Sequence, residues 1–394
     1  MGRIGIYGGT FNPPHIGHIY AMQYAISVLE LDLLYVIPAC ISPHKDLPTG
    51  SASPAQRLEM LRLATSGIEK VKISDIELQR GGVSYTYETV AQVKAQNPED
   101  ELVFLMGTDM FLSFDSWRFP EKIIEKASLG VLYRGDKDEQ EKIAAQKVCL
   151  ERSGAKIYLV ANPVTQISST DLRRMLVFRC AEPFLPAGVG AYIKENHLYD
   201  VCSPYGKLPM EQLEKVVVGL LKPSRVPHVL GCRDTAVELA KLWHADEVAA
   251  ARAALHHDIT KALDGRLQLT LCRQYGIILD KFSEENPKTL HALTGALVAE
   301  RIFEEPAEVV NAIRYHTTGK ANMTTLQKII YVADYMEPNR DFPGVMELRN
   351  LAYTDLDKAL KLGLEMTIDL LKEQRREISP ASEQALAYLT QAGI

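Results

Sequence analysis

The pattern of hydrophobic and polar positions divides the chain into two parts near residue 200. In the first part, short apolar runs rich in β-branched residues alternate with stretches of helical periodicity. The pattern predicts strands at Arg3–Tyr7, Leu33–Ile37, Val71–Ile76, Leu102–Met106, Leu129–Tyr133 and Lys156–Val160. It predicts helices at Ile16–Leu29, Pro54–Ser66 and Tyr87–Gln96. Alternation of strand and helix with nearly continuous apolar strands favours a doubly wound, parallel α/β sheet.

One helix start is defined by its own residues. Ser53 is placed as an N-cap, Pro54 falls in the first turn, and Gln56 completes a capping box.

After Tyr199 the strand-like runs stop and helical periodicity dominates. The segment 203–209, Ser-Pro-Tyr-Gly-Lys-Leu-Pro, has the turn residues of a linker. Helices are predicted beyond it at Glu211–Leu221, Asp234–Trp243, Asp246–His257, Thr289–Phe303, Ala307–His316, Thr325–Tyr335, Thr354–Glu373 and Ser382–Leu389. We therefore expect domains at 1–202 and 210–394, the second of them all-α.

Composition and charge narrow the function classes. The chain has 394 residues, which is more than one hydrophobic core usually supports. Its net charge of −6 argues against a nucleic-acid binder held by bulk positive charge. Its six cysteines are widely spaced, which argues against a zinc ribbon or a disulfide framework and suits a reducing cytoplasm. With no long apolar run and no signal-peptide pattern, we expect a cytoplasmic protein without membrane contact.

The first chemical motif is Gly8-Gly9-Thr10-Phe11-Asn12-Pro13-Pro14-His15-Ile16-Gly17-His18, between the first strand and the first helix. The glycines allow a tight turn and close approach of a ligand to the backbone. A helix N-terminus attracts anions, and His15 and His18 share one face of the first turn. The motif therefore predicts a phosphate site. The alternative is a glycine-rich turn with two incidental surface histidines.

A second motif has the same chemistry. Ser168 can cap a helix with Asp171 at its third position, and Arg173 offers a planar fork that suits phosphate oxygens. By itself this could be an ordinary capped helix with a surface arginine.

Together these motifs resemble the nucleotidylyltransferase superfamily, and the longer first motif is similar to bacterial nicotinate-nucleotide adenylyltransferases. The resemblance covers nearly all of residues 1–201 and implies a Rossmann-like fold. It includes Pro43-His44-Lys45, Gly82 to Thr86, Gly107-Thr108-Asp109, Trp117 and Ile167 to Arg173.

The resemblance implies that AMP passes from ATP, with Mg²⁺, to nicotinate mononucleotide. It assigns the phosphates of ATP to Thr10, His15, His18, Lys45 and Arg173, with His18 at the reacting phosphate. It places further substrate contacts at Gly8, Gly9, Phe11, Tyr85, Thr86, Gly107, Asp109, Trp117, Ser168, Ser169 and Thr170. Asp109 would bind a ribose hydroxyl or orient the pyridine nucleotide. Trp117 would stack on the nicotinate ring, or else be a core aromatic residue.

Histidine and aspartate recur in the helical half. The candidates are His228, His257, Asp258, His291, His316 and Asp334. Imidazoles and carboxylates from several helices are what a metal centre in a bundle requires. The alternative is that each histidine only satisfies local hydrogen bonds.

The pattern His…His-Asp…Asp resembles the HD phosphohydrolases, and residues 224–394 are similar to symmetrical diadenosine tetraphosphatases. The resemblance implies a di-iron site or another divalent metal pair, bridged by Asp258. It also implies that Lys261 neutralises charge on a diadenosine polyphosphate, which is cleaved to two ADP. His256 departs from this family, which usually has an apolar residue there.

We therefore expect a bifunctional enzyme. Alternatively, the first half adenylylates nicotinamide mononucleotide or phosphopantetheine, and the HD half senses nucleotides or hydrolyses a different one. The sequence leaves open whether the chain forms a homo-oligomer.

Overall fold

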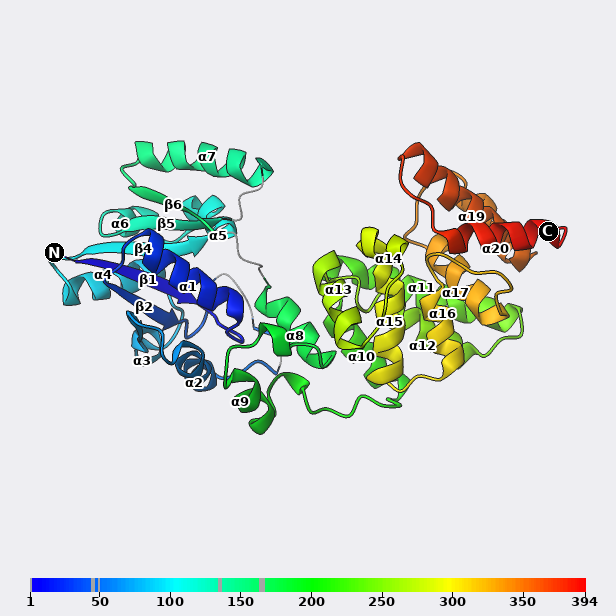
Figure 1. The fold of residues 1–394 in the computed structure, drawn as a ribbon, viewed down its shortest axis with the longest axis horizontal. Helices are drawn as coiled ribbons and strands as arrows, with labels where there is room; N and C mark the ends of the chain where they lie inside the picture. Colours follow the sequence, from blue (N-terminus) through cyan, green and yellow to red (C-terminus); the bar gives the residue numbers. More distant parts are fainter. Residues whose placement is uncertain (1, 44–46, 49, 134–136, 163–166) are drawn as a thin grey trace. The chain divides into compact units, whose positions relative to one another are not determined.

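The computed structural model describes residues 2–43, 47–48, 50–133, 137–162 and 167–394. The chain forms two compact units, Met1–Ser203 and Pro204–Ile394 (Figure 1). No helix in the described part of the chain is both long and apolar enough to cross a membrane.

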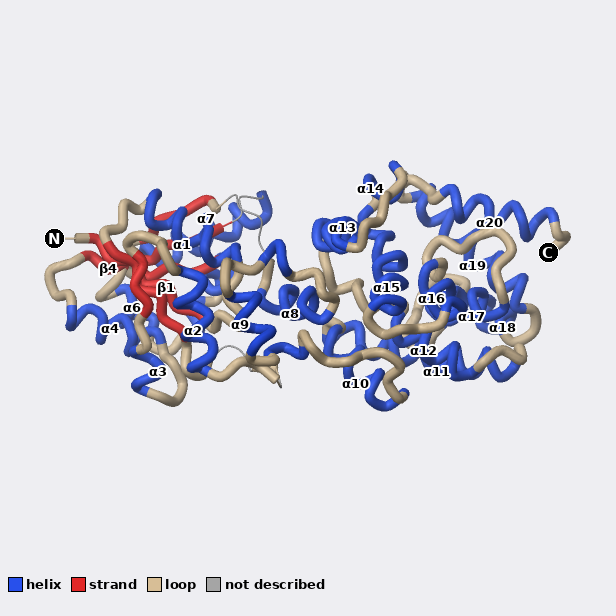
Figure 2. Tube along the Cα trace, turned by 60° about the horizontal axis from the view of Figure 1, so that its bottom comes forward, coloured by secondary structure: helices blue, strands red, loops and turns tan. Residues whose placement is uncertain are grey.

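The first unit is built on one six-stranded sheet, whose strands are red in Figure 2. Its strands are β1 (Arg3–Gly9), β2 (Leu33–Pro38), β3 (Val71–Ile73), β4 (Glu101–Gly107), β5 (Ser128–Tyr133) and β6 (Ile157–Ala161). They pair in the order β3-β2-β1-β4-β5-β6, and every pairing is parallel. This confirms the predicted α/β fold.

Helices cover both faces of this sheet. They are α1 (Ile16–Val28), α2 (Pro54–Thr65), α3 (Ile76–Arg80), α4 (Thr86–Gln96), α5 (Thr108–Leu112), α6 (Pro120–Ile124), α7 (Lys137–Arg152), α8 (Ser169–Val177) and α9 (Val189–Glu195). Side chains of β4 alternate between the two resulting cores. Phe104 packs with Val90 of α4, whereas Leu105 packs with Met22 of α1.

The strand order reverses between β1 and β4. Chain leaving β1 continues to β2 on one side, and chain leaving β4 continues to β5 on the other. In such a sheet the two connections diverge and leave a crevice at the carboxyl ends of the strands. The glycine-rich motif follows β1 and the segment Gly107 to Asp109 follows β4, so both lie at this crevice.

The capping box predicted for α2 is present. The amide of Gln56 donates to Ser53 Oγ at 3.3 Å, and the amide of Ser53 donates to Gln56 Oε1 at 2.9 Å. The strand predicted at Val71–Ile76 is wrong in its second half. It ends at Ile73, and the chain turns into α3 at Ile76.

The second unit is all-helical in its described residues, as predicted. Its helices are α10 (Met210–Leu220), α11 (Val226–Leu242), α12 (Glu247–His256), α13 (Gly265–Gln274), α14 (Lys281–Glu285), α15 (Leu290–Arg301), α16 (Ala307–Arg314), α17 (Thr325–Met336), α18 (Val345–Ala352), α19 (Leu356–Glu373) and α20 (Pro380–Gln391). The start predicted for α11 at Asp234 is wrong by two turns. Pro227 lies in the first turn of this helix, where a missing N–H costs nothing.

Residues 204–209 pack on the second unit. The Tyr205 ring is buried against Phe303, with centroids 5.5 Å apart. The amide of Lys207 donates to the carbonyl of Phe303 at 3.1 Å, and Arg252 Nη1 donates to the carbonyl of Leu208 at 2.8 Å. The segment expected to be a linker is thus largely fixed to the helical unit.

Candidate functional site

The loop after β1 is held by a buried arginine. Arg57 on α2 has no exposed surface. Its Nη1 donates to the carbonyl of Thr10 at 2.8 Å, and its Nη2 donates to those of Ala39 and Cys40 at 2.7 and 3.1 Å. The guanidinium therefore joins the loop after β1 to the loop after β2.

The same loop is held from the other side by α8. Ser169 Oγ donates to the carbonyl of Pro13 at 3.0 Å, and Arg173 Nη1 donates to that of Asn12 at 2.7 Å. The Tyr199 hydroxyl donates to Asn12 Oδ1 at 2.7 Å. Contacts between residues more than 150 positions apart thus bring the two predicted phosphate motifs together.

The N-terminus of α8 is built as predicted. Ser168 Oγ accepts from the amide of Asp171 at 3.0 Å. A Cβ added at Gly17 would lie 3.9 Å from the amide nitrogen of Ile167, so the N-termini of α1 and α8 meet. Two helix N-termini at one point create a positive potential suited to phosphate.

His15 and His18 stack at the start of α1, with ring centroids 3.6 Å apart. The amide of His15 donates to His18 Nδ1 at 3.1 Å. Because Nδ1 accepts this bond, the neutral His18 ring carries its proton on Nε2. Burial lowers the pKa of His15 to about 3, so this ring is neutral at pH 7.

A side chain would be tightly placed at two glycine positions of the motif. A Cβ on Gly17 would lie 3.0 Å from Nδ1 of His15, and one on Gly9 would lie 3.0 Å from the ring of Phe11. Phe11 in turn packs edge-on against His18 at 5.0 Å. Gly17 therefore leaves room for the His15 ring, and Gly9 leaves room for the Phe11 ring that packs on His18.

The other predicted contacts lie in several places. Asp109 is exposed on α5, beside the carboxyl end of β1. Tyr85 and Thr86 begin α4, and Arg118 lies over the Tyr85 ring at 4.5 Å. Trp117 is 8% exposed and packs against Phe104 and Phe114, an arrangement that favours the core alternative. Lys45 lies outside the described residues.

Sequence reasoning gave no role to Arg57, Asn12 or Tyr199. The available sign was that Arg57 shares its helix face with the apolar residues Met60 and Leu61, and a buried guanidinium needs several acceptors. The acceptors here are backbone carbonyls, which a sequence pattern does not reveal.

In the second unit, all six predicted metal-ligating residues converge. His228 lies on α11, Asp334 on α17 and His291 on α15, and the others lie at or just after the ends of α12 and α16. The Nε2 of His228 is 3.1 Å from that of His257 and 3.0 Å from Asp334 Oδ1. Two groups have ligand atoms mutually within 4.8 Å: His228, His257 and Asp334, and His257, Asp258 and His316.

Asp258 stands between these groups. Its Oδ2 faces His257 Nε2 at 3.5 Å and His228 Nε2 at 3.8 Å. Its Oδ1 faces His291 Nε2 at 3.3 Å and His316 Nε2 at 3.9 Å. A carboxylate with one oxygen toward each set of imidazoles has the geometry of a bridging ligand.

Each imidazole presents the same nitrogen to the centre. Three of the rings use Nδ1 to contact a backbone carbonyl: His257 to Ala254 at 2.6 Å, His291 to Lys288 at 2.9 Å and His316 to Ile313 at 2.7 Å. The fourth, His228, uses Nδ1 to contact Glu337 Oε1 at 3.0 Å. A ring that donates from Nδ1 has its lone pair on Nε2, the state that binds metal.

The protonation states also fit metal binding. Burial lowers the pKa of His291 to about 4 and that of His316 to about 3. Burial opposes the charge of Asp334, but the imidazoles that face it and the Arg340 guanidinium hold its pKa well below the usual range. His316 Nε2 and Asp258 Oδ1 are buried and have no hydrogen-bond partner within the described residues. This donor set fits divalent transition metals, because neutral imidazoles and ionised carboxylates need no proton loss to bind.

Three cations surround these ligands. Arg225 contacts Asp258, Arg340 Nη2 lies 2.7 Å from Asp334 Oδ1, and Lys261 Nζ lies 2.8 Å from His291 Nε2. Each is partly exposed, with side-chain exposures of 28%, 32% and 41% respectively. Positive groups at the rim of an acidic centre suit an anionic substrate.

His256 faces away from this centre. Its Nδ1 is 2.9 Å from the carbonyl of Arg252, and its ring packs on Phe303. His256, at a position where the resemblance leads us to expect an apolar residue, therefore serves in packing.

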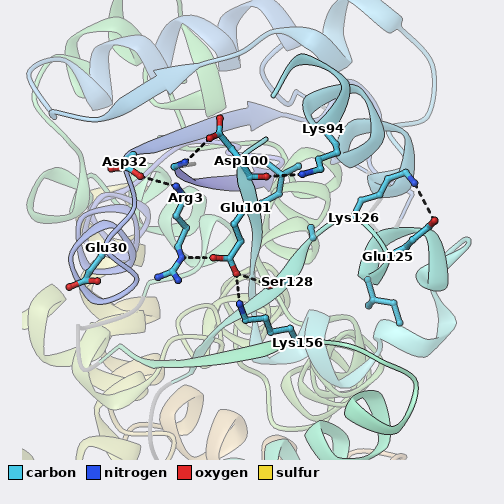
Figure 3. A pocket seen from close by; sticks show the side chains of 14 residues that line it. Arg3, Glu30, Asp32, Lys94, Asp100, Glu101, Glu125, Lys126, Ser128 and Lys156 are labelled. Atoms are coloured by element: carbon cyan, nitrogen blue, oxygen red, sulfur yellow. Dashed lines mark hydrogen bonds and ion pairs between the residues drawn. The ribbon is translucent and has the colours of Figure 1, made fainter. Parts of the chain in front are cut away.

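A depression of about 610 Å³ lies elsewhere, at the amino ends of the strands of the first unit (Figure 3). Several of its charged groups form ion pairs, and others bond to the backbone. Glu101 contacts Arg3 at 2.9 Å and Lys156 at 2.6 Å, as Figure 3 shows. Since the predicted residues lie at the other edge of the sheet, we assign no ligand here.

Comparison with known proteins identifies both units. Residues 6–175 match the cytidylyltransferase-like family. Over 198 residues the chain is 36% identical to the probable nicotinate-nucleotide adenylyltransferase of Borreliella burgdorferi, which covers 50% of this chain and 96% of the relative. Through this half, the chain belongs to the nicotinate-nucleotide adenylyltransferase family. We call its first unit the adenylyltransferase unit.

Residues 225–339 match the HD domain family, and we call the second unit the HD unit. Over 171 residues the chain is 42% identical to the symmetrical bis(5′-nucleosyl)-tetraphosphatase of Halalkalibacterium halodurans, or 41% of this chain and 88% of the relative. A crystal structure described as a predicted HD superfamily hydrolase involved in NAD metabolism, from Clostridium acetobutylicum, is 37% identical with a TM-score of 0.46. That match covers 48% of this chain and 100% of the solved one.

Proposed function

We propose that the chain is a bifunctional enzyme. Its adenylyltransferase unit transfers AMP from ATP to nicotinate mononucleotide, giving deamido-NAD and pyrophosphate. Its HD unit hydrolyses diadenosine tetraphosphate to two ADP. We expect both activities in the cytoplasm.

For the first activity, the decisive observation is the meeting of the α1 and α8 N-termini at the loop that carries His15 and His18. A 5′-phosphate oxygen of nicotinate mononucleotide attacks the α-phosphorus of ATP, and the bond to the β-phosphate breaks. The Nε2–H of His18 is placed to donate to an oxygen of the reacting phosphate. Arg173 and Lys45 bind the departing pyrophosphate, and Mg²⁺ enters with ATP.

Three acceptors test this assignment. Pyrophosphate release from ATP is measured with nicotinate mononucleotide, nicotinamide mononucleotide and phosphopantetheine, each at several concentrations. The proposal requires the highest kcat/KM with nicotinate mononucleotide. A higher value with either alternative acceptor would overturn it.

For the second activity, the decisive observation is the convergence of four Nε2 atoms on the two oxygens of Asp258 and on Asp334. A pair of divalent metals supplies a water nucleophile and charge stabilisation in such sites. Six residues would hold that pair, namely His228, His257, Asp258, His291, His316 and Asp334. Lys261, Arg225 and Arg340 would bind the polyphosphate. Attack at a phosphorus atom next to the central bridging oxygen, with cleavage of its bond to that oxygen, gives two ADP.

Product analysis tests the second activity. Purified protein loaded with Fe²⁺ without oxygen, or with Mn²⁺, is incubated with diadenosine tetraphosphate, and nucleotides are separated by chromatography. ADP alone is the expected product, whereas AMP with ATP would indicate the wrong bond. If no nucleotide forms while added diadenosine tetraphosphate changes the adenylylation rate, the HD unit is a sensor.

A further inference from the structure

We infer that Glu337 is a positioning residue of the metal centre, which sets the donor strength and orientation of His228. This inference rests on metal binding in the proposed function of the HD unit. Glu337 lies directly after α17, three residues beyond Asp334, and its side chain is 1% exposed. Its carboxylate contacts His228 and Asn339, so it would act on the centre through the imidazole of His228.

His228 differs from the other three imidazoles in its Nδ1 partner. The rings of His257, His291 and His316 are oriented by backbone carbonyls, whose positions follow from the helices. His228 lies in the first turn of the long helix α11 and reaches a carboxylate from another element, at 3.0 Å. A carboxylate accepts the Nδ1 proton more strongly than a carbonyl, and this makes Nε2 a stronger donor to a metal.

The surroundings of Glu337 are shaped for a carboxylate. The backbone amide and the side-chain amide of Asn339 both donate to its Oε2 at 2.8 Å. The Asn339 side chain also donates to the carbonyl of Pro227, next to His228 in the chain, at 3.1 Å. Asn339 therefore holds the Glu337 carboxylate in place through Oε2, and Oε1 of the same carboxylate orients His228.

Gly231 supplies the space for this arrangement. A Cβ at position 231 would lie 2.5 Å from Glu337 Oε2, which is closer than such atoms approach in proteins. Gly231 lies three residues after His228, on the same face of α11. The absence of a side chain at Gly231 thus leaves room for the Glu337 carboxylate to reach His228.

The experiment measures metal binding, separately from catalysis. Purified full-length protein is stripped of metal, and Co²⁺ and Mn²⁺ affinities are measured by competition with a chelator. The Co²⁺ absorption bands report the ligand geometry. Glu337→Ala is expected to lower affinity about 10- to 100-fold and to change these bands. Glu337→Gln keeps the size and an acceptor oxygen, so its affinity should lie at or above that of Glu337→Ala.

A matched control separates positioning from general packing. Glu305 is also 1% exposed in the HD unit, but it pairs with Arg252 and contacts none of the six ligands. Glu305→Gln should unfold more easily while keeping the affinity and the Co²⁺ spectrum of wild-type protein. Equal loss of affinity in Glu305→Gln and Glu337→Gln would overturn the inference.

A double-mutant cycle gives a second test. Gly231→Ala should lower metal affinity by displacing the carboxylate, and should cost little more in the Glu337→Ala background. Equal losses in both backgrounds would contradict the inference, as would wild-type affinity in Glu337→Ala. If wild-type protein binds no metal, the proposed metal centre itself is wrong; if it binds metal but releases no ADP, only the proposed reaction fails.

Discussion

Individual histidines of this chain are given opposite roles by the partner of one ring nitrogen. His18 Nδ1 accepts a backbone N–H, so under the proposed function Nε2–H is the donor to phosphate. His257, His291 and His316 use Nδ1 toward carbonyl oxygens, which leaves the Nε2 lone pair for a metal. The residue type alone therefore does not define the chemistry, because the local backbone selects which nitrogen carries the proton.

Removing the donor of His18 should slow the transfer step. We expect His18→Ala to lower kcat for pyrophosphate release about 10²- to 10³-fold, the usual effect of losing one transition-state donor. His197→Asn, at an exposed position of the same unit, should leave kcat unchanged. Steady-state kinetics with nicotinate mononucleotide measure both. A His18→Ala kcat near that of wild type would assign the donor elsewhere.

Burial of His15 should make the adenylyltransferase unit less stable in acid. Its pKa is lowered to about 3, whereas the unfolded chain has a value near 6.5. The unfolded state therefore binds the proton first, and stability falls as the pH drops below about 6.5. Between pH 7 and pH 5 we expect a loss of about 2 kcal/mol from this residue.

Urea unfolding at both pH values measures this loss. The sequence has two tryptophans, so Trp117 alone reports on this unit in a Trp243→Phe background. His15→Asn in that background should lose less stability on acidification. The same pH dependence with and without His15 would show that other groups cause it.

At the scale of elements, helices α2 and α8 hold the loop after β1 by donating to its carbonyl oxygens. Arg57 of α2 donates to one carbonyl of this loop and to two carbonyls of the loop after β2. Ser169 and Arg173 of α8 donate to two more carbonyls of the loop after β1. The loop is therefore rigid before any nucleotide arrives, which lowers the ordering cost of binding.

Replacing Arg57 should release this loop. We expect Arg57→Leu to destabilise the adenylyltransferase unit by about 3 kcal/mol, because buried carbonyls lose their donors. We also expect kcat to fall by a larger factor than the nucleotide affinity of the folded protein. Arg62→Leu, on the exposed face of the same helix, should cost less than about 1 kcal/mol. Urea unfolding and pyrophosphate release provide the measurements.

The sequence predicted strongly patterned elements well and failed where tertiary contacts decide. All six strands were placed, because most of them are nearly continuous apolar runs. Residues 74–76 were assigned to a strand although Ile76 begins a short helix, since one apolar residue cannot distinguish the two. The helix α13 was missed, as its buried residues are separated by polar ones. The candidate metal-ligating residues were found by type, whereas the contacts of Glu337 and Arg57 depend on the folded geometry.

For the whole molecule, the division into two units predicts two separable activities. Asp258 is fully buried among the imidazoles of the HD unit. Asp258→Ala should abolish ADP release from diadenosine tetraphosphate and leave deamido-NAD formation within about twofold of wild type. Loss of both activities would show that the units depend on each other.

Metal removal should divide the activities in the same way. After dialysis against a strong chelator, Mg²⁺ alone should restore adenylyl transfer, since that metal arrives with ATP. ADP release should return only with Mn²⁺, Fe²⁺ or a similar ion, because imidazole ligands bind Mg²⁺ poorly. Full ADP release with Mg²⁺ alone would contradict this assignment.

The way in which residues 204–209 adhere to the HD unit determines where the chain can be cut. Tyr205 packs on Phe303. Arg252 donates from Nε and Nη2 to Glu305 and from Nη1 to the carbonyl of Leu208. A fragment that starts at Met210, where the first helix begins, would expose an aromatic surface and remove an arginine contact. A fragment that starts at Pro204 keeps both, so separate production of the two halves should divide the gene between Ser203 and Pro204.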